Sequence, residues 1–261
     1  MPTLASFVTV WPLLAALMLF LYLVHLRTRN AAIVDVGWAL GLPIAALWHT
    51  WRPGTGPAAW LLALLTVVWG LRLAGYLFVS RVLTPHEDGR YTDLRQAWGP
   101  AAPWRFFVFF QAQALLDLVL SLPMWLVARD AGSIGALEIT ASVLWGVALV
   151  GEAVADRQLA RFRARPDSRG RVCDVGLWRY SRHPNYFFEW LVWVSYALFA
   201  SAAPYGWAAW SAPALMLYFL FRVTGIPATE AQAVRSRGEA YRRYQRTTSA
   251  FVPWPPRKVS A

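Results

Sequence analysis

Seven apolar segments, each long enough to cross a lipid bilayer, constrain this chain more than any other feature. A transmembrane helix needs about 20 mainly apolar residues, and 57% of the 261 residues are hydrophobic while only 15% are charged. We therefore expect an all-α integral membrane protein with a single domain over residues 1–261. Proline and polar residues interrupt several segments, so the sequence leaves the helix number open by one. The expected spans are 7–26, 31–49, 57–79, 104–127, 134–153, 184–203 and 205–226.

The basic residues predict the orientation. The formal net charge is +11, and 22 of the 25 Lys and Arg residues fall in or beside the loops on one side of the expected membrane. Arg52 and Arg129 lie on the other side, and Arg72 lies within a helix. Because cytoplasmic loops carry excess Lys and Arg, we expect the N-terminus outside and the C-terminus in the cytoplasm. This orientation explains the charge without nucleic acid as a partner.

Processing and covalent cross-links contribute little to the expected fold. No basic residue precedes the first apolar segment, so we expect no cleaved signal peptide there. The single cysteine, Cys173, excludes an intrachain disulfide.

Five ionisable side chains fall inside the apolar segments, where each costs about 2.5–3.5 kcal/mol at a helix centre. They are Asp35, Arg72, Asp117, Glu152 and Glu189. Helical spacing of four residues groups most of them with other polar or aromatic side chains: Arg72 with Tyr76, Glu152 with Asp156, and Glu189 with Asn185 and Trp193. We expect all of these groups except Asp35 to lie near cytoplasmic helix ends and to line one shared cavity.

Simpler roles remain open for several of these residues. Asp117 can merely hydrogen-bond a neighbouring helix. The arginines from Arg157 to Arg182 can bind lipid headgroups, and Trp69 and Trp193 can be core or interface aromatics among 16 tryptophans.

The stretch GLWRYSRHPNYFFEWLVW, residues 176–193, changes from basic to apolar at its midpoint. Its first half carries Arg179, Arg182 and His183, and Glu189 interrupts the second half. Guanidinium groups suit phosphates, so this stretch predicts one wall of a site for an anionic cofactor. The chain has no glycine-rich nucleotide motif, and its four scattered histidines predict no metal site.

Several motifs resemble one known family. GLWRYSRHPNYFFEW, ADRQLARFRA, GIPATEAQ and YRRYQRTTSAFVPW, with VDVGW, WGLRLAGYL and EDGRY, are similar to the steroid 5α-reductase superfamily, in its bacterial branch related to the 3-oxo-5α-steroid 4-dehydrogenase C-terminal domain. The resemblance extends from Asp35 to Trp254. It implies a seven-helix, NADPH-dependent reductase of the carbon–carbon double bond of a membrane-soluble enone, with a 3-oxo-Δ4-steroid, reduced to its 5α-dihydro product, as the type substrate.

The resemblance also implies where the site lies. The cofactor half would be formed mainly by residues 150–254 and would face the cytoplasm of a bacterial inner membrane, while the substrate would enter a monomer from the bilayer. The implied cofactor-binding residues are Arg72, Tyr76, Asp156, Arg163, Arg171, Arg179, His183, Asn185, Glu189, Trp193, Arg222 and Glu230.

The chain departs from the steroid enzymes at the expected substrate end. A Gln-Glu pair there is replaced by Val34-Asp35, and a tyrosine is replaced by Trp69. We expect Asp35 and Trp69 to bind substrate, with Asp35 as a neutral acid in apolar surroundings that donates to the developing oxyanion. Glu189 and Tyr76 complete the expected catalytic set.

Two other functions remain open. Membrane methyltransferases that use S-adenosylmethionine share the RHPNY-type motif, although that cofactor has no phosphates for the eight arginines between Arg157 and Arg182. A sterol- or lipid-binding protein without catalysis is the third possibility.

Overall fold

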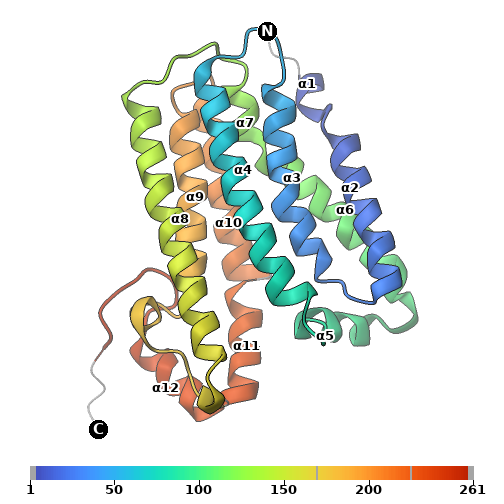
Figure 1. The fold of residues 1–261 in the computed structure, drawn as a ribbon, viewed down its shortest axis with the longest axis vertical. Helices are drawn as coiled ribbons and strands as arrows, with labels where there is room; N and C mark the ends of the chain where they lie inside the picture. Colours follow the sequence, from blue (N-terminus) through green and yellow to red (C-terminus); the bar gives the residue numbers. More distant parts are fainter. Residues whose placement is uncertain (1–3, 169, 224, 258–261) are drawn as a thin grey trace. The chain divides into compact units, whose positions relative to one another are not determined.

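The computed structural model describes residues 4–168, 170–223 and 225–257, and it is helical throughout, with no strand in those ranges (Figure 1). A single isolated bridge joins Ser181 and Ser249. The elements are α1 (Leu4–Val8), α2 (Trp11–Thr28), α3 (Ile33–Thr50), α4 (Pro57–Leu77), η1 (Phe78–Val82), α5 (Gly89–Trp98), η2 (Gly99–Ala101), α6 (Ala102–Leu120), α7 (Leu122–Val127), α8 (Ala136–Arg163), η3 (Pro166–Ser168), η4 (Gly176–Arg179), α9 (Pro184–Ala200), η5 (Gly206–Trp210), α10 (Ser211–Tyr218), η6 (Phe219–Val223), α11 (Ile226–Arg237) and α12 (Glu239–Thr247).

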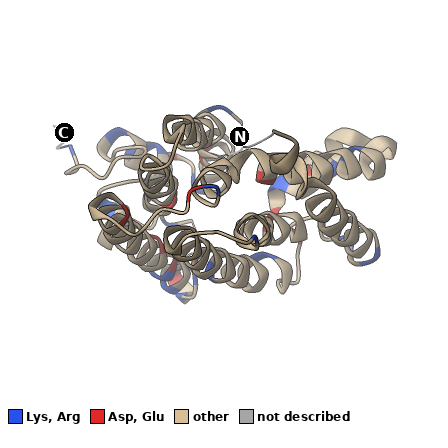
Figure 2. Ribbon diagram, turned by 90° about the horizontal axis from the view of Figure 1, so that it is seen from above, with Lys and Arg blue, Asp and Glu red and all other residues tan. Residues whose placement is uncertain are grey.

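Six helical segments of the described chain are long and apolar enough to cross a membrane, which confirms the expected class of protein. They are Leu4–Thr28, Ile33–Thr50, Pro57–Val82, Gly89–Val127, Ala136–Arg163 and Gly206–Arg237. The expected span 184–203 forms α9, which at 17 residues is shorter than these six. In Figure 2 most of the ribbon carries neither sign of charge, as the composition requires.

The helices group into two compact units, and the first contains the described residues within Met1–Ile139 and Tyr196–Ala209. Its central helix is α3, which packs against α2, α4, α6 and α7 (Figure 1). Trp69, Phe106 and Phe110 are fully buried in this core. At Gly41, the absence of a side chain lets α3 approach α6, because a Cβ there would overlap the carboxyl group of Asp117.

The second unit contains the described residues within Thr140–Ser195 and Trp210–Ala261. Phe251 anchors the C-terminal segment to a buried cluster with Leu220 and Ile226, and its ring lies edge-on to Phe187 with the centroids 5.6 Å apart. A second cluster buries Ala233, Tyr241 and Tyr244 between α11 and α12. This packing fixes the segment that follows α12 against α9, η6 and α11.

Candidate functional site

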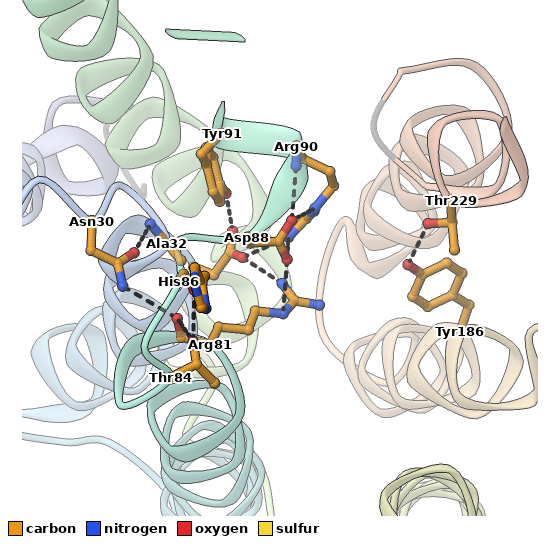
Figure 3. A network of polar contacts seen from close by, with 11 residues as sticks. Asn30, Ala32, Arg81, Thr84, His86, Asp88, Arg90, Tyr91, Tyr186 and Thr229 are labelled. Atoms are coloured by element: carbon orange, nitrogen blue, oxygen red, sulfur yellow. Dashed lines mark hydrogen bonds and ion pairs between the residues drawn. The ribbon is translucent and has the colours of Figure 1, made fainter. Parts of the chain in front are cut away.

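In the first unit, Asp35 is the centre of a network of charged and hydroxyl groups, whose members Arg81, Arg90 and Tyr91 are labelled in Figure 3. Its Oδ2 accepts hydrogen bonds from Arg81 Nη1 and from Arg90 Nη2, the latter at 3.0 Å. Its Oδ1 accepts from the Tyr91 hydroxyl at 2.5 Å. Asp88 caps α5 and binds Arg90 Nε at 3.1 Å. The prediction that Asp35 has apolar surroundings is therefore wrong, since two guanidinium groups contact its carboxylate.

Burial and the neighbouring arginines shift the pKa of Asp88 in opposite directions. Burial of the carboxyl group favours its neutral form, but the hydrogen bond and positive charge of Arg90 outweigh it and lower the pKa of Asp88 below its ordinary value. The network thus holds two aspartates against two arginines.

A second set of contacts ties this network to the connection between α2 and α3. Glu87 Oε1 accepts from the Ala31 backbone amide at 2.6 Å and from Arg95 Nη2 at 2.8 Å. The Asn30 side-chain amide donates to the Arg81 carbonyl at 3.3 Å. These hydrogen bonds hold together three parts of the chain: the α2–α3 connection, η1, and α5 with the residues just before it.

Arg81 reaches Asp35 from a π-helical turn. α4 ends at Leu77 and continues as η1, in which the Leu83 amide donates to the Phe78 carbonyl at 3.0 Å. Such wider turns rotate the following side chains relative to a regular helix and are frequent at functional sites. Phe78–Val82 contains no proline or glycine that would indicate this turn in the sequence. Because the turn was not predicted, Arg81 was not predicted as a partner of Asp35.

Two of the predicted positions are also wrong. We expected Asp35 to lie far from the helix ends that adjoin the basic loops. It is instead the third residue of α3, just after the loop that contains Arg29. Asp117, expected near such an end, lies about 22 Å along α6 from its start. Its carboxyl group is fully buried and packs on Gly41, near the middle of α3.

In the second unit, Glu230 is the acceptor for three side chains. Arg182 Nε donates to Glu230 Oε1 at 2.6 Å, Gln245 Nε2 donates to Oε2 at 2.8 Å, and His183 Nε2 lies 3.2 Å from Oε1. The His183 ring stacks on Tyr186 with centroids 5.3 Å apart. Burial of the ring lowers the pKa of His183 below its ordinary value despite the nearby carboxylate of Glu230.

Arg182 also fixes the chain that follows α12. Its Nη1 donates to the carbonyls of Gln245 at 3.0 Å and Thr248 at 2.5 Å, and its backbone amide donates to Ser249 at 2.8 Å. Four donors of one residue are thus used within the protein. Sequence reasoning noted Arg182 as part of a basic cluster but assigned it no role, and it missed Gln245.

A cleft of about 880 Å³ opens in the second unit beside this cluster. Its lining includes three arginines, Arg171, Arg179 and Arg243, and the threonines Thr247 and Thr248. We call it the arginine cleft. Arg171 and Arg179, from the segment before α9, had been predicted to bind cofactor; Arg243 on α12 had not, because nothing in the sequence pairs α12 with that segment.

Two acids also line the arginine cleft, Asp174 and Glu239. Glu239 forms an exposed ion pair with Arg246 at 2.7 Å, and Arg171 forms one with Asp167. Exposed pairs contribute little free energy, so Arg171 can exchange Asp167 for a bound anion. The three arginines are therefore available to a ligand, whereas the Thr247 hydroxyl already donates to the carbonyls of Arg243 and Tyr244.

Comparison with known proteins places the chain in one family, because the model of that family matches residues 21–248. The chain belongs to the DUF1295 family, described as a protein family of unknown function. An uncharacterized protein of Schizosaccharomyces pombe is 27% identical over 216 residues, which cover 72% of this chain and 62% of the yeast protein. The DUF1295 chain thus spans less than two thirds of that relative's length. No solved structure matches.

The remaining predicted residues of the DUF1295 chain are spread over both units. In the second unit, Asn185 Nδ2 donates to Asp156 Oδ1 at 3.4 Å, and Trp193 is fully buried two turns beyond Asn185 on α9. Glu189, between them, is half-buried. Arg163 and Arg222 are exposed at the ends of α8 and η6, and neither lines the arginine cleft.

The three residues predicted on α4 belong to the first unit. Trp69 is fully buried, with its ring edge-on to Trp38 at 5.9 Å and to Tyr196 at 6.5 Å. Arg72 and Tyr76 follow in the last two turns and are half-buried. Among the described residues, no group of three His, Cys, Asp or Glu has the arrangement of a metal site.

Proposed function

We propose that this chain is an NADPH-dependent reductase that acts on the carbon–carbon double bond of a membrane-soluble enone. The type substrate is a 3-oxo-Δ4-steroid, which would become the 5α-dihydro product. The observation that carries the proposal is the arginine cleft, which is built mainly by residues 150–254, the part of the chain whose motifs resemble the C-terminal domain of steroid 5α-reductases.

The composition and size of the arginine cleft fit a cofactor with several phosphates. The planar guanidinium groups of Arg171, Arg179 and Arg243 suit bidentate contacts with phosphate oxygens. A volume of about 880 Å³ lies within the usual range for ligand sites. Arg171 is our candidate for the 2′-phosphate, which distinguishes NADPH from NADH.

Bound NADPH would supply the hydride for the β-carbon of the enone. Residues of the chain would bind the nicotinamide end and stabilise the charge that develops on the ketone oxygen. We propose Asn185 and Glu189 for the carboxamide, and we retain Arg72, Tyr76 and Trp193 as further contacts to be tested one by one. A proton delivered to the α-carbon completes the reduction, so that the double bond becomes a CH–CH single bond.

The role proposed for Asp35 changes with its surroundings. A carboxylate that accepts from two arginines and a tyrosine suits an ionised group, whereas a donor to an oxyanion must carry a proton. We propose that Asp35 positions Tyr91 and Arg90, and that the donor to the ketone oxygen comes from Trp69 or Tyr76.

The proposed orientation follows the distribution of the arginines. We propose seven spans, with the N-terminus outside and the C-terminus in the cytoplasm of a bacterial inner membrane. α9 would be the seventh span, since 17 residues cover about 25 Å. The cofactor would then enter from the cytoplasm and the apolar substrate from the bilayer.

The test uses the full-length protein purified in detergent. We expect NADPH to bind and to be oxidised when progesterone, a 3-oxo-Δ4-steroid, is added, with one 5α-dihydro product formed for each NADPH consumed. Binding of S-adenosylmethionine in place of NADPH would support the methyltransferase instead. Steroid binding with neither cofactor would leave a lipid-binding protein.

A further inference from the structure

A second cavity, of about 310 Å³, lies under the chain that follows α12 in the second unit. Three arginines line it, Arg182, Arg246 and Arg257, together with the hydroxyl-bearing residues Thr247, Thr248 and Ser249. Its lining contains no Asp or Glu. We call it the tail cavity. A cavity lined by three arginines, with no acid among its described lining residues, is complementary to a phosphate group.

Exposed apolar side chains stand beside these charges. Trp254, which also lines the tail cavity, has 67% of its surface exposed, and Val252 has 51% exposed. Tryptophan and arginine together are typical of segments that lie at the membrane–water interface. A soluble phosphate compound would use the charges but not these apolar groups.

The exposure of Trp254 is built into the fold and does not reflect a loose chain. The Trp254 amide donates to the Tyr180 carbonyl at 2.9 Å, and Ser181 Oγ donates to the Phe251 carbonyl at 2.7 Å. Phe251 itself is buried in the core of the unit. The backbone between Phe251 and Trp254 is therefore held at both ends while two apolar side chains remain outside.

The tail cavity also belongs to the part of the chain that follows the last candidate membrane span. The last candidate span, Gly206–Arg237, is separated from α12 by Gly238 alone, and the tail cavity begins within α12. In α12, Tyr241 and Tyr244 face the protein, whereas Arg242, Arg243 and Arg246 are exposed.

We infer that the tail cavity is a binding site for the headgroup phosphate of an anionic phospholipid, with Trp254 and Val252 inserted among the lipids around it. Arg246 and Arg257 would contact the phosphate. Arg182, which forms an ion pair with Glu230, would not contact the phosphate but would add positive charge to the cavity lining. Arg246 can leave its exposed partner Glu239 at little cost. This inference does not depend on the proposed reductase activity.

The experiment measures lipid retention by the full-length protein in detergent micelles by native mass spectrometry. Phosphatidylglycerol and phosphatidylcholine compete at equal concentration, with glycerol 3-phosphate and inorganic phosphate as soluble probes. We expect preferential binding of phosphatidylglycerol. Arg257→Gln should weaken it about fivefold, the usual effect of one arginine at an anionic surface, and Trp254→Ala should weaken it as well.

Arg242→Gln is the matched control, because Arg242 is exposed on the same helix but lines neither cavity. It should retain the wild-type preference, and all three variants should melt at the wild-type temperature without added lipid. Equal loss in the Arg242 and Arg257 variants would overturn the site in favour of a general basic surface. Unchanged phosphatidylglycerol binding by Trp254→Ala, together with its displacement by glycerol 3-phosphate, would overturn the lipid in favour of a soluble anion.

Discussion

Arg182 and Glu230, 48 residues apart in the sequence, form an ion pair with Nε and Oε1 2.6 Å apart and with only 11% and 14% of their side chains exposed. The pair joins the segment before α9 to α11, and through the other donors of Arg182 it also holds the chain after α12. We therefore expect this contact to govern the order of the cofactor half of the protein.

Arg182→Gln tests that role through stability. The substitution removes the charged hydrogen bonds to Glu230 and to two carbonyls, and each such loss costs about 1.5–3 kcal/mol. The melting temperature in detergent should fall well below that of the wild type. Arg179→Gln is a suitable control, since Arg179 is exposed on the same segment; a similar decrease in both variants would contradict the role given to Arg182.

His183 makes stability depend on pH. Because burial lowers its pKa from the ordinary 6.5, the unfolded chain binds a proton more readily than the folded one below that pH. The stability contributed by neutral His183 is present above pH 6.5 and is lost as the pH falls through the lowered folded value. Melting temperatures between pH 7.5 and pH 5 should decrease less in His183→Gln than in the wild type. Parallel curves would show that another group titrates.

Asp35→Asn distinguishes the ionised carboxylate from the neutral donor. The amide keeps the shape but leaves Asp88 as the one carboxylate shared by Arg81 and Arg90, so we expect a loss of about 1.5–3 kcal/mol, close to that of Asp35→Ala. Adding Arg90→Gln should recover part of the loss, because it removes the excess positive charge. Wild-type stability in Asp35→Asn with reduced turnover would restore the neutral-donor role.

Gly41→Ala tests the close approach of α3 and α6. The added methyl group would overlap the Asp117 carboxyl group, and overpacking of this kind typically costs about 1–3 kcal/mol. Asp117→Ala in the same chain should relieve the overlap. Gly75→Ala is the control, because open space surrounds that position and alanine favours the helix; an equal effect at both glycines would contradict the packing described.

The six candidate spans could be predicted from the sequence, because a long apolar segment is what a bilayer crossing requires. The wider turns at Phe78–Val82 and Phe219–Val223 could not, since they depend on tertiary packing and leave no local signal. The sequence did not predict α5 either, because its residues are mostly polar and resemble a loop. In the structure, Asp88 caps the start of this helix.

The candidate site was predictable only in part. The motif before α9 contains Arg179, one of the three arginines that line the cleft, because phosphate chemistry directs attention to that residue type. The surroundings of Asp35 were misjudged, because its sequence neighbours are apolar while its spatial neighbours, Arg81, Arg90 and Tyr91, come from about 50 residues away.

The most direct measurement compares NADPH and NADH binding to the purified wild type, Arg171→Ala and Arg165→Ala. Arg165 is exposed near Arg171 but does not line the arginine cleft. The account predicts that the wild type and Arg165→Ala prefer NADPH and that Arg171→Ala binds NADPH about ten- to a hundredfold more weakly, the effect of one charged hydrogen bond, with little change for NADH. Absence of NADPH binding to the wild type would contradict the proposed function, and equal weakening of both nucleotides would move Arg171 away from the 2′-phosphate.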